Sequence, residues 1–208
     1  MPELTAAPVT LILLIANVVV SLYALFSDPS LINRLSFRPR PILENGEYYR
    51  MITAGFIHGG LMHLAFNMYA LYLFGPVLEG ILGPVKFLVV YFGAELAAHG
   101  LTLALHKNNP NYAAVGASGA VSGIVFGFCL FYPNQGLGLI FIPIFIPAYL
   151  FALLYVGFSI FAMRRAQEQG QLGGIAHEAH IGGAIGGLLL TVLMEPRAIP
   201  FFLDQIGL

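Results

Sequence analysis

The sequence contains few charged side chains. Asp, Glu, Lys and Arg make up 9% of its 208 residues, whereas a soluble domain contains about 25%. Hydrophobic residues reach 58%, and the mean hydropathy is +0.83. So little polar surface cannot coat a soluble globule, which predicts an integral membrane protein. The formal net charge of −1 also excludes the basic surface typical of nucleic-acid-binding proteins, so we expect no nucleic-acid partner.

Cysteine and tryptophan are nearly or wholly missing. The single Cys129 excludes an internal disulfide. The chain has no Trp, so Tyr and Phe must supply the aromatic belts at the bilayer surfaces. Nothing basic precedes the first apolar stretch, so we expect no cleavable signal peptide. The sequence also lacks a linker or a low-complexity tail, which predicts a single domain over residues 1–208.

Long apolar runs are what the sequence does contain. A membrane-spanning helix needs about 20 mostly apolar residues. Six segments suit this role, at residues 8–26, 61–82, 85–106, 115–132, 137–163 and 177–194. We therefore predict an all-α, polytopic bundle of six transmembrane helices. Pro143 and Pro147 predict a kink or a tilt in the fifth helix, and residues 27–50 are polar enough to lie at the membrane interface instead of spanning it.

Two glycine-rich segments carry the residues of chemical interest. Ser118 begins an apolar run in which glycines recur at positions 119, 123 and 127, every fourth residue, so they form one smooth face of a helix. A second helix-compatible ladder of glycines, at positions 182, 183, 186 and 187, follows His180. We expect the two ladders to pack and to bring Ser118 into contact with His180.

Four polar residues are expected near one membrane face. The second, fourth and sixth helices run in the same direction, and His63, Asn67, Ser118 and His180 all lie early in them. A serine hydroxyl becomes a good nucleophile when a base such as histidine accepts its proton. His63 and Asn67 are spaced i, i+4 and could donate, with the backbone N–H of Ser118, to an oxyanion. The pattern predicts a Ser118–His180 dyad without an acidic third member.

Several alternatives remain beside the dyad. Glycine ladders often serve plain helix packing, and a histidine within a membrane is often a structural hydrogen-bonding residue. Residues 116–120 do not match the nucleophile elbow of soluble hydrolases. His177 and His180 are three apart, whereas the zinc helix motif needs histidines four apart. A metal site made of these histidines with Glu95 and His99 is a minor alternative, and we expect neither a metal nor another cofactor.

The sequence resembles the rhomboid intramembrane serine proteases over nearly its whole length. Four motifs in the right order carry the resemblance: His58 to Asn67, Glu79 with Gly83, Gly116 to Gly119, and Ala179 to Gly183. The resemblance implies a six-helix core in a bacterial inner membrane, with Ser118 as nucleophile and His180 as general base. It implies an oxyanion hole of His63, Asn67 and the Ser118 amide. It also implies that the substrates are transmembrane segments of other membrane proteins.

Two positions depart from the family pattern, and the charges leave the orientation open. A Trp-Arg pair common in the family's first loop reads Tyr49-Arg50 here, and Ser122 replaces an aromatic residue often found four residues after the serine. The second departure predicts different packing under His180. The topology of bacterial members would place seven of the nine Lys and Arg residues outside, all but Lys86 and Arg197, whereas the positive-inside rule predicts the reverse.

The resemblance leaves two other classes of function open. A catalytically silent relative that binds transmembrane helices is the main alternative, and the presence of both Ser118 and His180 favours the enzyme. A transporter of small molecules or ions is disfavoured, because the sequence has no evident inverted repeat.

Overall fold

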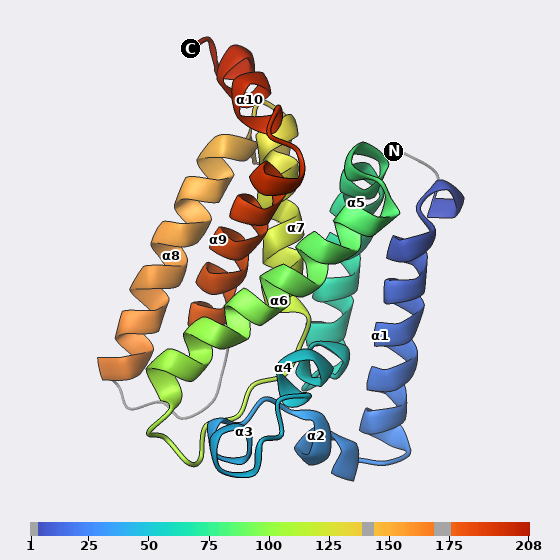
Figure 1. Cartoon of the computed structure of the whole chain (residues 1–208), viewed down its shortest axis with the longest axis vertical. Coiled ribbons are helices and arrows are strands. Elements are labelled where there is room, and N and C mark those ends of the chain that lie inside the picture. Colours follow the sequence, from blue (N-terminus) through green and yellow to red (C-terminus); the bar gives the residue numbers. More distant parts are fainter. Residues whose placement is uncertain (1–3, 139–143, 169–175) are drawn as a thin grey trace.

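The computed structural model describes residues 4–138, 144–168 and 176–208, and in these ranges the chain is mostly helical (Figure 1). The elements are η1 (Leu4–Ala6), α1 (Pro8–Phe26), α2 (Ser30–Leu35), α3 (Pro39–Asn45), α4 (Arg50–Thr53), η2 (Ala54–Phe56), α5 (Leu61–Leu82), α6 (Pro84–His106), α7 (Ser118–Phe131), β1 (Gly136–Gly138), β2 (Phe145–Pro147), α8 (Ala148–Glu168), α9 (His177–Met194) and α10 (Ala198–Ile206). The predicted all-α membrane bundle is confirmed.

Within the described ranges, five helices are long and apolar enough to cross a membrane, namely α1, α5, α6, α8 and α9. Helix α7 is apolar but has only 14 residues, a length of about 21 Å against a hydrocarbon core of about 30 Å. Every residue of α7 from Gly119 to Phe131 is buried, because α7 packs against α5, α6 and α9. The helix that begins with Ser118 is therefore the central helix of the bundle.

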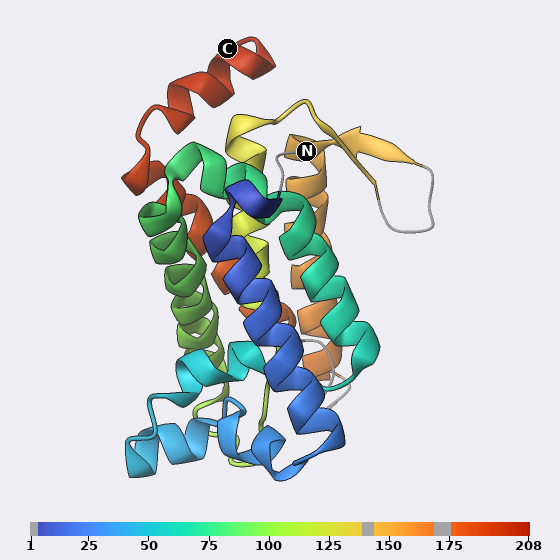
Figure 2. The same ribbon diagram turned by 90° about the vertical axis from the view of Figure 1, so that its right-hand side faces the viewer.

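The fifth predicted helix, 137–163, is wrong in its first part. Strands β1 and β2 pair antiparallel there, with Gly136 opposite Pro147, and α8 begins only at Ala148. Proline has no N–H to donate inside a helix and is tolerated where a helix begins, so Pro147 precedes α8 and does not kink it. Pro143 lies outside the described residues. Figure 2 shows the two strands projecting from the bundle at the end opposite α2–α4.

The fourth helix begins at Ser118 instead of residue 115. Gly116 has a φ of +111°, which lies outside the right-handed helical region and which side chains other than glycine rarely adopt. The chain therefore turns at Gly116 and enters α7 directly at the serine.

The turns at the far end of α5 are fixed by Glu79 and Gly83. The buried carboxylate of Glu79 accepts hydrogen bonds from the Val9 amide at 3.0 Å and from the amide and hydroxyl of Thr10, both at 2.7 Å. Amides in the first turn of a helix have no partner within it, so Glu79 holds the start of α1 against α5. Gly83, with a φ of +77°, makes the tight turn into α6.

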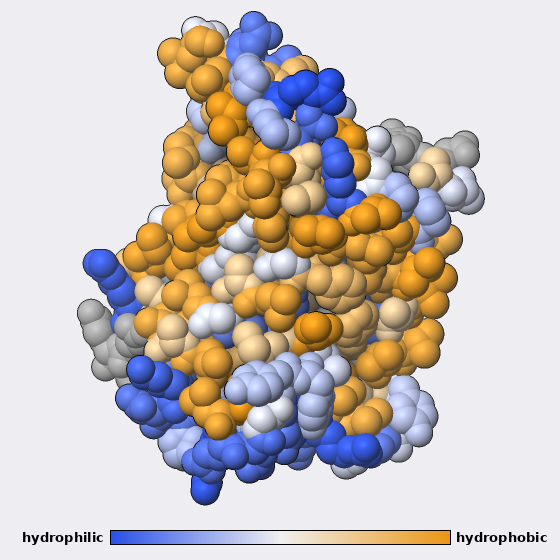
Figure 3. All heavy atoms as spheres, viewed as in Figure 1, coloured by the Kyte–Doolittle hydropathy of each residue, from blue (hydrophilic) through white to orange (hydrophobic). Residues whose placement is uncertain are grey.

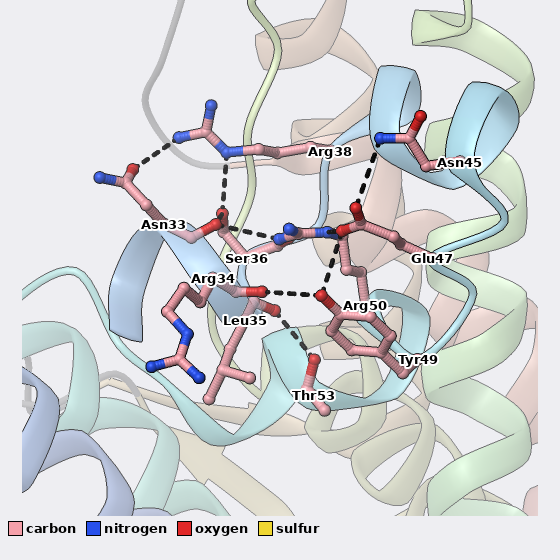
Figure 4. A network of polar contacts seen from close by, with 10 residues as sticks. All are labelled: Asn33, Arg34, Leu35, Ser36, Arg38, Asn45, Glu47, Tyr49, Arg50 and Thr53. Atoms are coloured by element: carbon pink, nitrogen blue, oxygen red, sulfur yellow. Dashed lines mark hydrogen bonds and ion pairs between the residues drawn. The ribbon is translucent and has the colours of Figure 1, made fainter. Parts of the chain in front are cut away.

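The segment from residue 27 to 60 forms a compact cap of short helices at one end of the bundle (Figure 1). Arg50 lies at its centre and is 8% exposed. Its guanidinium donates to Glu47 at 2.6 Å and to the carbonyls of Asn33 and Ser36 at 2.9 and 3.0 Å (Figure 4). The arginine of the Tyr49-Arg50 pair thus ties three parts of the cap together.

Acid should weaken this cap through Glu47. The hydrogen bond from Arg50 lowers the pKa of Glu47 from its ordinary value of 4.5. A carboxylate with a lowered folded-state pKa stabilises the fold above its unfolded pKa and loses that contribution as the pH falls through the folded value. We expect Glu47→Gln to lower the melting temperature at pH 7, with the difference from wild type shrinking as the pH falls below 4.5. A difference independent of pH would contradict this assignment.

The charged residues gather at the end that carries the cap. In Figure 3 apolar side chains cover the middle of the visible face, and polar side chains lie below them around α2–α4. The four arginines of the cap, Lys107 after α6 and the two arginines near the end of α8 lie at this end, whereas Lys86 and Arg197 lie at the other (Figure 1). The bundle therefore has an apolar belt, and all of its Lys and Arg residues except Lys86 and Arg197 lie at one end.

Candidate active site

Helices α7 and α9 are in backbone contact along their glycines. A Cβ atom added to Gly183 would overlap the backbone of Gly119, and one added to Gly187 would overlap the backbone of Gly123. At the next turn, a Cβ on Gly127 would lie 2.7 Å from the hydroxyl oxygen of Thr191. The predicted packing of the two ladders is confirmed for Gly183 and Gly187, whereas Gly182 and Gly186 face Ala97 of α6.

This close packing places the four predicted site residues around one cavity. Ser118 is the first residue of α7, and His180 lies in the first turn of α9. Both line a cavity of about 1770 Å³, together with His63 and Asn67 of α5. Three helices that are far apart in sequence therefore present these polar groups to the same space.

Ser118 and His180 both line the cavity, but among the described residues no hydrogen bond joins the Ser118 hydroxyl to the His180 ring. The His180 ring stacks on Tyr155 with a centroid distance of 5.9 Å and an interplanar angle of 24°. The rings of His177 and His180 meet edge to face, with a centroid distance of 5.8 Å. Catalytic hydrogen bonds often close only when substrate binds, so this arrangement is compatible with proton transfer from Ser118 to His180.

The carboxylate of Glu178 pairs with residues other than His180. The Tyr112 hydroxyl donates a hydrogen bond to the Glu178 carboxylate, and His106 Nε2 lies 3.2 Å from the same carboxylate. Burial and the nearby carboxylate raise the pKa of the Tyr112 phenol, so the phenol stays protonated and donates. Glu178 thus anchors the start of α9 to the loop that precedes α7.

Hydrogen-bond donors face the cavity beside Ser118. Asn67 Nδ2 donates to the His63 carbonyl at 2.9 Å, and because an amide group has two N–H bonds, one remains for the cavity. The His63 ring packs over Gly116, where any Cβ atom would overlap the ring. Among the hydrogen bonds of the described residues, none has the Ser118 amide as its donor, as is usual in the first turn of a helix.

His58, the first residue of the His58–Asn67 motif, has a supporting role that the sequence did not predict. Its Nε2 accepts the amide N–H of Ala117 at 3.4 Å, and its Nδ1 lies 2.8 Å from the Ser21 hydroxyl. Ser21 donates its only hydroxyl proton to the Phe56 carbonyl at 3.0 Å, so the proton between Ser21 and His58 belongs to Nδ1. His58 therefore holds the residue before Ser118 to α1. The spacing of residues in the His58–Asn67 motif does not predict this contact with α1.

The alternative metal site is not formed. Glu95 accepts the amide N–H of Ala120 at 3.0 Å in the first turn of α7, and His99 Nδ1 lies 2.7 Å from the Met51 carbonyl oxygen. Neither residue lines the cavity that contains His180. Among the described residues, no three His, Cys, Asp or Glu side chains gather as metal ligands. Glu95 instead fixes the first turn of α7.

The chain is similar in sequence to a known family and to several individual proteins. The family model for the rhomboid domain matches residues 45–197. The putative rhomboid protease YdcA of Bacillus subtilis (strain 168) is 33% identical over 156 residues, which are 73% of this chain and 69% of that protein. The rhomboid protease GluP of the same organism is 30% identical over 161 residues, 77% of this chain and 29% of that protein. The human mitochondrial presenilin-associated rhomboid-like protein is 30% identical over 142 residues, 66% of this chain and 36% of that protein.

Proposed function

Because the chain belongs to the rhomboid family, we propose that it is an intramembrane serine endopeptidase that cleaves transmembrane segments of other membrane proteins. Ser118 is the nucleophile and His180 the general base in this proposal. The observation that carries it is the meeting of Ser118, His180, His63 and Asn67 around one cavity. Relatives named rhomboid proteases support a protease.

The chemistry follows from the placement of these groups. His180 accepts the hydroxyl proton of Ser118 as its Oγ attacks the carbonyl carbon of the substrate. The resulting oxyanion accepts hydrogen bonds from the Ser118 amide, Asn67 and His63. His180 then returns the proton to the leaving amine, and the peptide bond breaks to leave an acyl group on Ser118. A water molecule, deprotonated by His180, hydrolyses this ester and restores the serine.

The shape of the cavity suits an apolar helix as substrate. Within α5 the residues that line the cavity extend from Leu61 to Ile81, nearly the whole of this 22-residue helix. A helix of that length measures about 33 Å, close to the thickness of the hydrocarbon core. Apolar side chains line the cavity, among them Leu73 and Val77 of α5 and Phe151 of α8. Ser118 lies toward the charged end, from which water can reach it.

Reconstitution tests the proposal directly. The purified protein in liposomes should cleave some members of a panel of single-span membrane proteins, and a fluorophosphonate probe should label Ser118 in the absence of substrate. Prior labelling should block cleavage. Binding of the panel without cleavage or labelling would instead identify a catalytically silent relative that recognises transmembrane helices.

Asn67→Ala should produce a slow enzyme with a nearly normal KM. Removing one oxyanion donor from a serine protease lowers kcat by about 10²–10³-fold, and the contact acts mainly in the transition state. If Asn67 only stabilises its helix, the loss is about 0.6 kcal/mol of stability with normal turnover. The variant's kcat and melting temperature, measured on one preparation, separate these outcomes.

Asn17→Ala is the matched control for this variant. Asn17 Nδ2 makes the same kind of bond within its helix, to the Leu13 carbonyl at 2.8 Å, but Asn17 does not line the cavity. The control should therefore lose stability without losing kcat. Equal kcat values for the two variants would remove Asn67 from the oxyanion hole.

A further inference from the structure

The ring that supports His180 comes from a helix outside the two glycine ladders. Tyr155 of α8 stacks on His180 and is itself held between Phe126 of α7 and Phe151 of α8, with centroid distances of 5.8 and 6.0 Å. Position 122 on α7, where the family often has an aromatic residue, is a serine in this chain. The aromatic surface under His180 is therefore supplied by α8.

Tyr155 is also joined to the residue of the nucleophile. Its hydroxyl lies 2.8 Å from the Ser122 hydroxyl, and Ser122 donates its only hydroxyl proton to the Ser118 carbonyl at 2.7 Å. The proton between Tyr155 and Ser122 must then belong to Tyr155. A chain of two hydrogen bonds thus runs from Tyr155 through Ser122 to the backbone of Ser118, while the ring of the same tyrosine packs against His180.

Helix α8 is otherwise loosely attached. Only 11% of residues 148–165 in α8 are buried inside the protein, compared with 44% of residues 177–194 in α9. The residues beside Tyr155 on the helix surface face outward, with Leu154 56% and Phe158 63% exposed. Tyr155 is thus a principal contact of α8 with the candidate site.

We propose that Tyr155 is a positioning residue that sets the orientation of His180 relative to Ser118. The inference rests on the proposed serine protease chemistry of these two residues. The Tyr155 ring packs against His180, and its hydroxyl is linked through Ser122 to the carbonyl of Ser118. A change in the position of the Tyr155 ring therefore changes the geometry between His180 and Ser118.

The test is the rate at which a small fluorophosphonate labels Ser118 in folded protein, with kcat and KM for cleavage of a single-span substrate. Tyr155→Leu removes the ring and should slow labelling and lower kcat by about 10²-fold, the cost of a misplacement near 1 Å, with a smaller effect on KM. Tyr155→Phe keeps the ring and should restore most of the rate. Phe161→Leu is the matched control, because Phe161 lies on the same helix and is 59% exposed; it should label at the wild-type rate.

Two further variants test the role of the Tyr155 hydroxyl. They remain informative even if Tyr155→Leu fails to fold. Ser122→Ala and Tyr155→Phe should each slow labelling by about threefold, the worth of an average hydrogen bond between membrane helices. The double variant should be no slower than Ser122→Ala alone, because both changes break one chain. Fully additive losses, or wild-type labelling by Tyr155→Leu, would overturn the positioning role. A wild-type protein that neither labels nor cleaves would instead refute the protease proposal itself.

Discussion

Ser118→Ala and His180→Ala should each abolish cleavage by the reconstituted protein. In a soluble serine protease, loss of either the serine or its histidine lowers kcat by about 10⁶-fold, and both residues line this cavity. The double variant should be no less active than either single variant, since the two residues act as a unit. Cleavage of a single-span substrate and probe labelling measure the effect.

A control separates loss of chemistry from loss of folding. Ser159 is a buried serine of α8, 1% exposed, that does not line the cavity. Ser159→Ala should keep wild-type cleavage, and all three single variants should have melting temperatures close to that of the wild type. Substantial cleavage by Ser118→Ala would exclude the serine mechanism. Labelling of a residue other than Ser118 would also count against it.

Gly183→Val should reduce activity by about 10²-fold or more. A Cβ atom at Gly183 would overlap the backbone of Gly119, and backbone cannot move aside as a flexible side chain can. Helices α7 and α9 must then separate, and a misplacement of reacting groups near 1 Å costs about 10²-fold in rate. Because His180 and Ser118 lie on these two helices close to the contact, the separation acts directly on the dyad. The rate of probe labelling reports the effect.

Gly100→Val is the matched control for the packing prediction. Gly100 lies in helix α6, and a Cβ atom there would meet nothing within 4 Å. The control should therefore retain labelling and cleavage, although it makes the same change in residue type. Wild-type labelling by Gly183→Val would mean that the glycine contact does not determine the geometry of the candidate site.

The position of Tyr155 gives a physical role to a departure from the family pattern. Ser122 is too small to support His180, yet its hydroxyl accepts the proton of Tyr155 and donates to the Ser118 carbonyl. The aromatic support and the hydrogen bond therefore come from two helices that meet at this point. The predicted change in packing under His180 is therefore present: the ring that packs against His180 comes from α8 instead of α7.

The sequence by itself determined the membrane bundle and the pairing of its central helices. Hydropathy and glycine spacing are local properties of a segment, and a helix of small residues at every fourth position has only one face on which a neighbour can approach closely. Ser118 and His180 each adjoin such a face, so their meeting follows once the ladders pack. The shared direction of alternate helices likewise places His63 and Asn67 beside the same cavity.

The tertiary structure alone decided the contacts that depend on how each helix is rotated about its axis. Nothing in the local pattern of α8 distinguishes Tyr155 from other apolar residues, and its contact with His180 requires the positions of three helices. The bond from His58 to Ala117 likewise joins segments that are 59 residues apart. The start of α8 depends on the pairing of β1 with β2. Such contacts arise between segments far apart in the chain, and local periodicity contains no information about them.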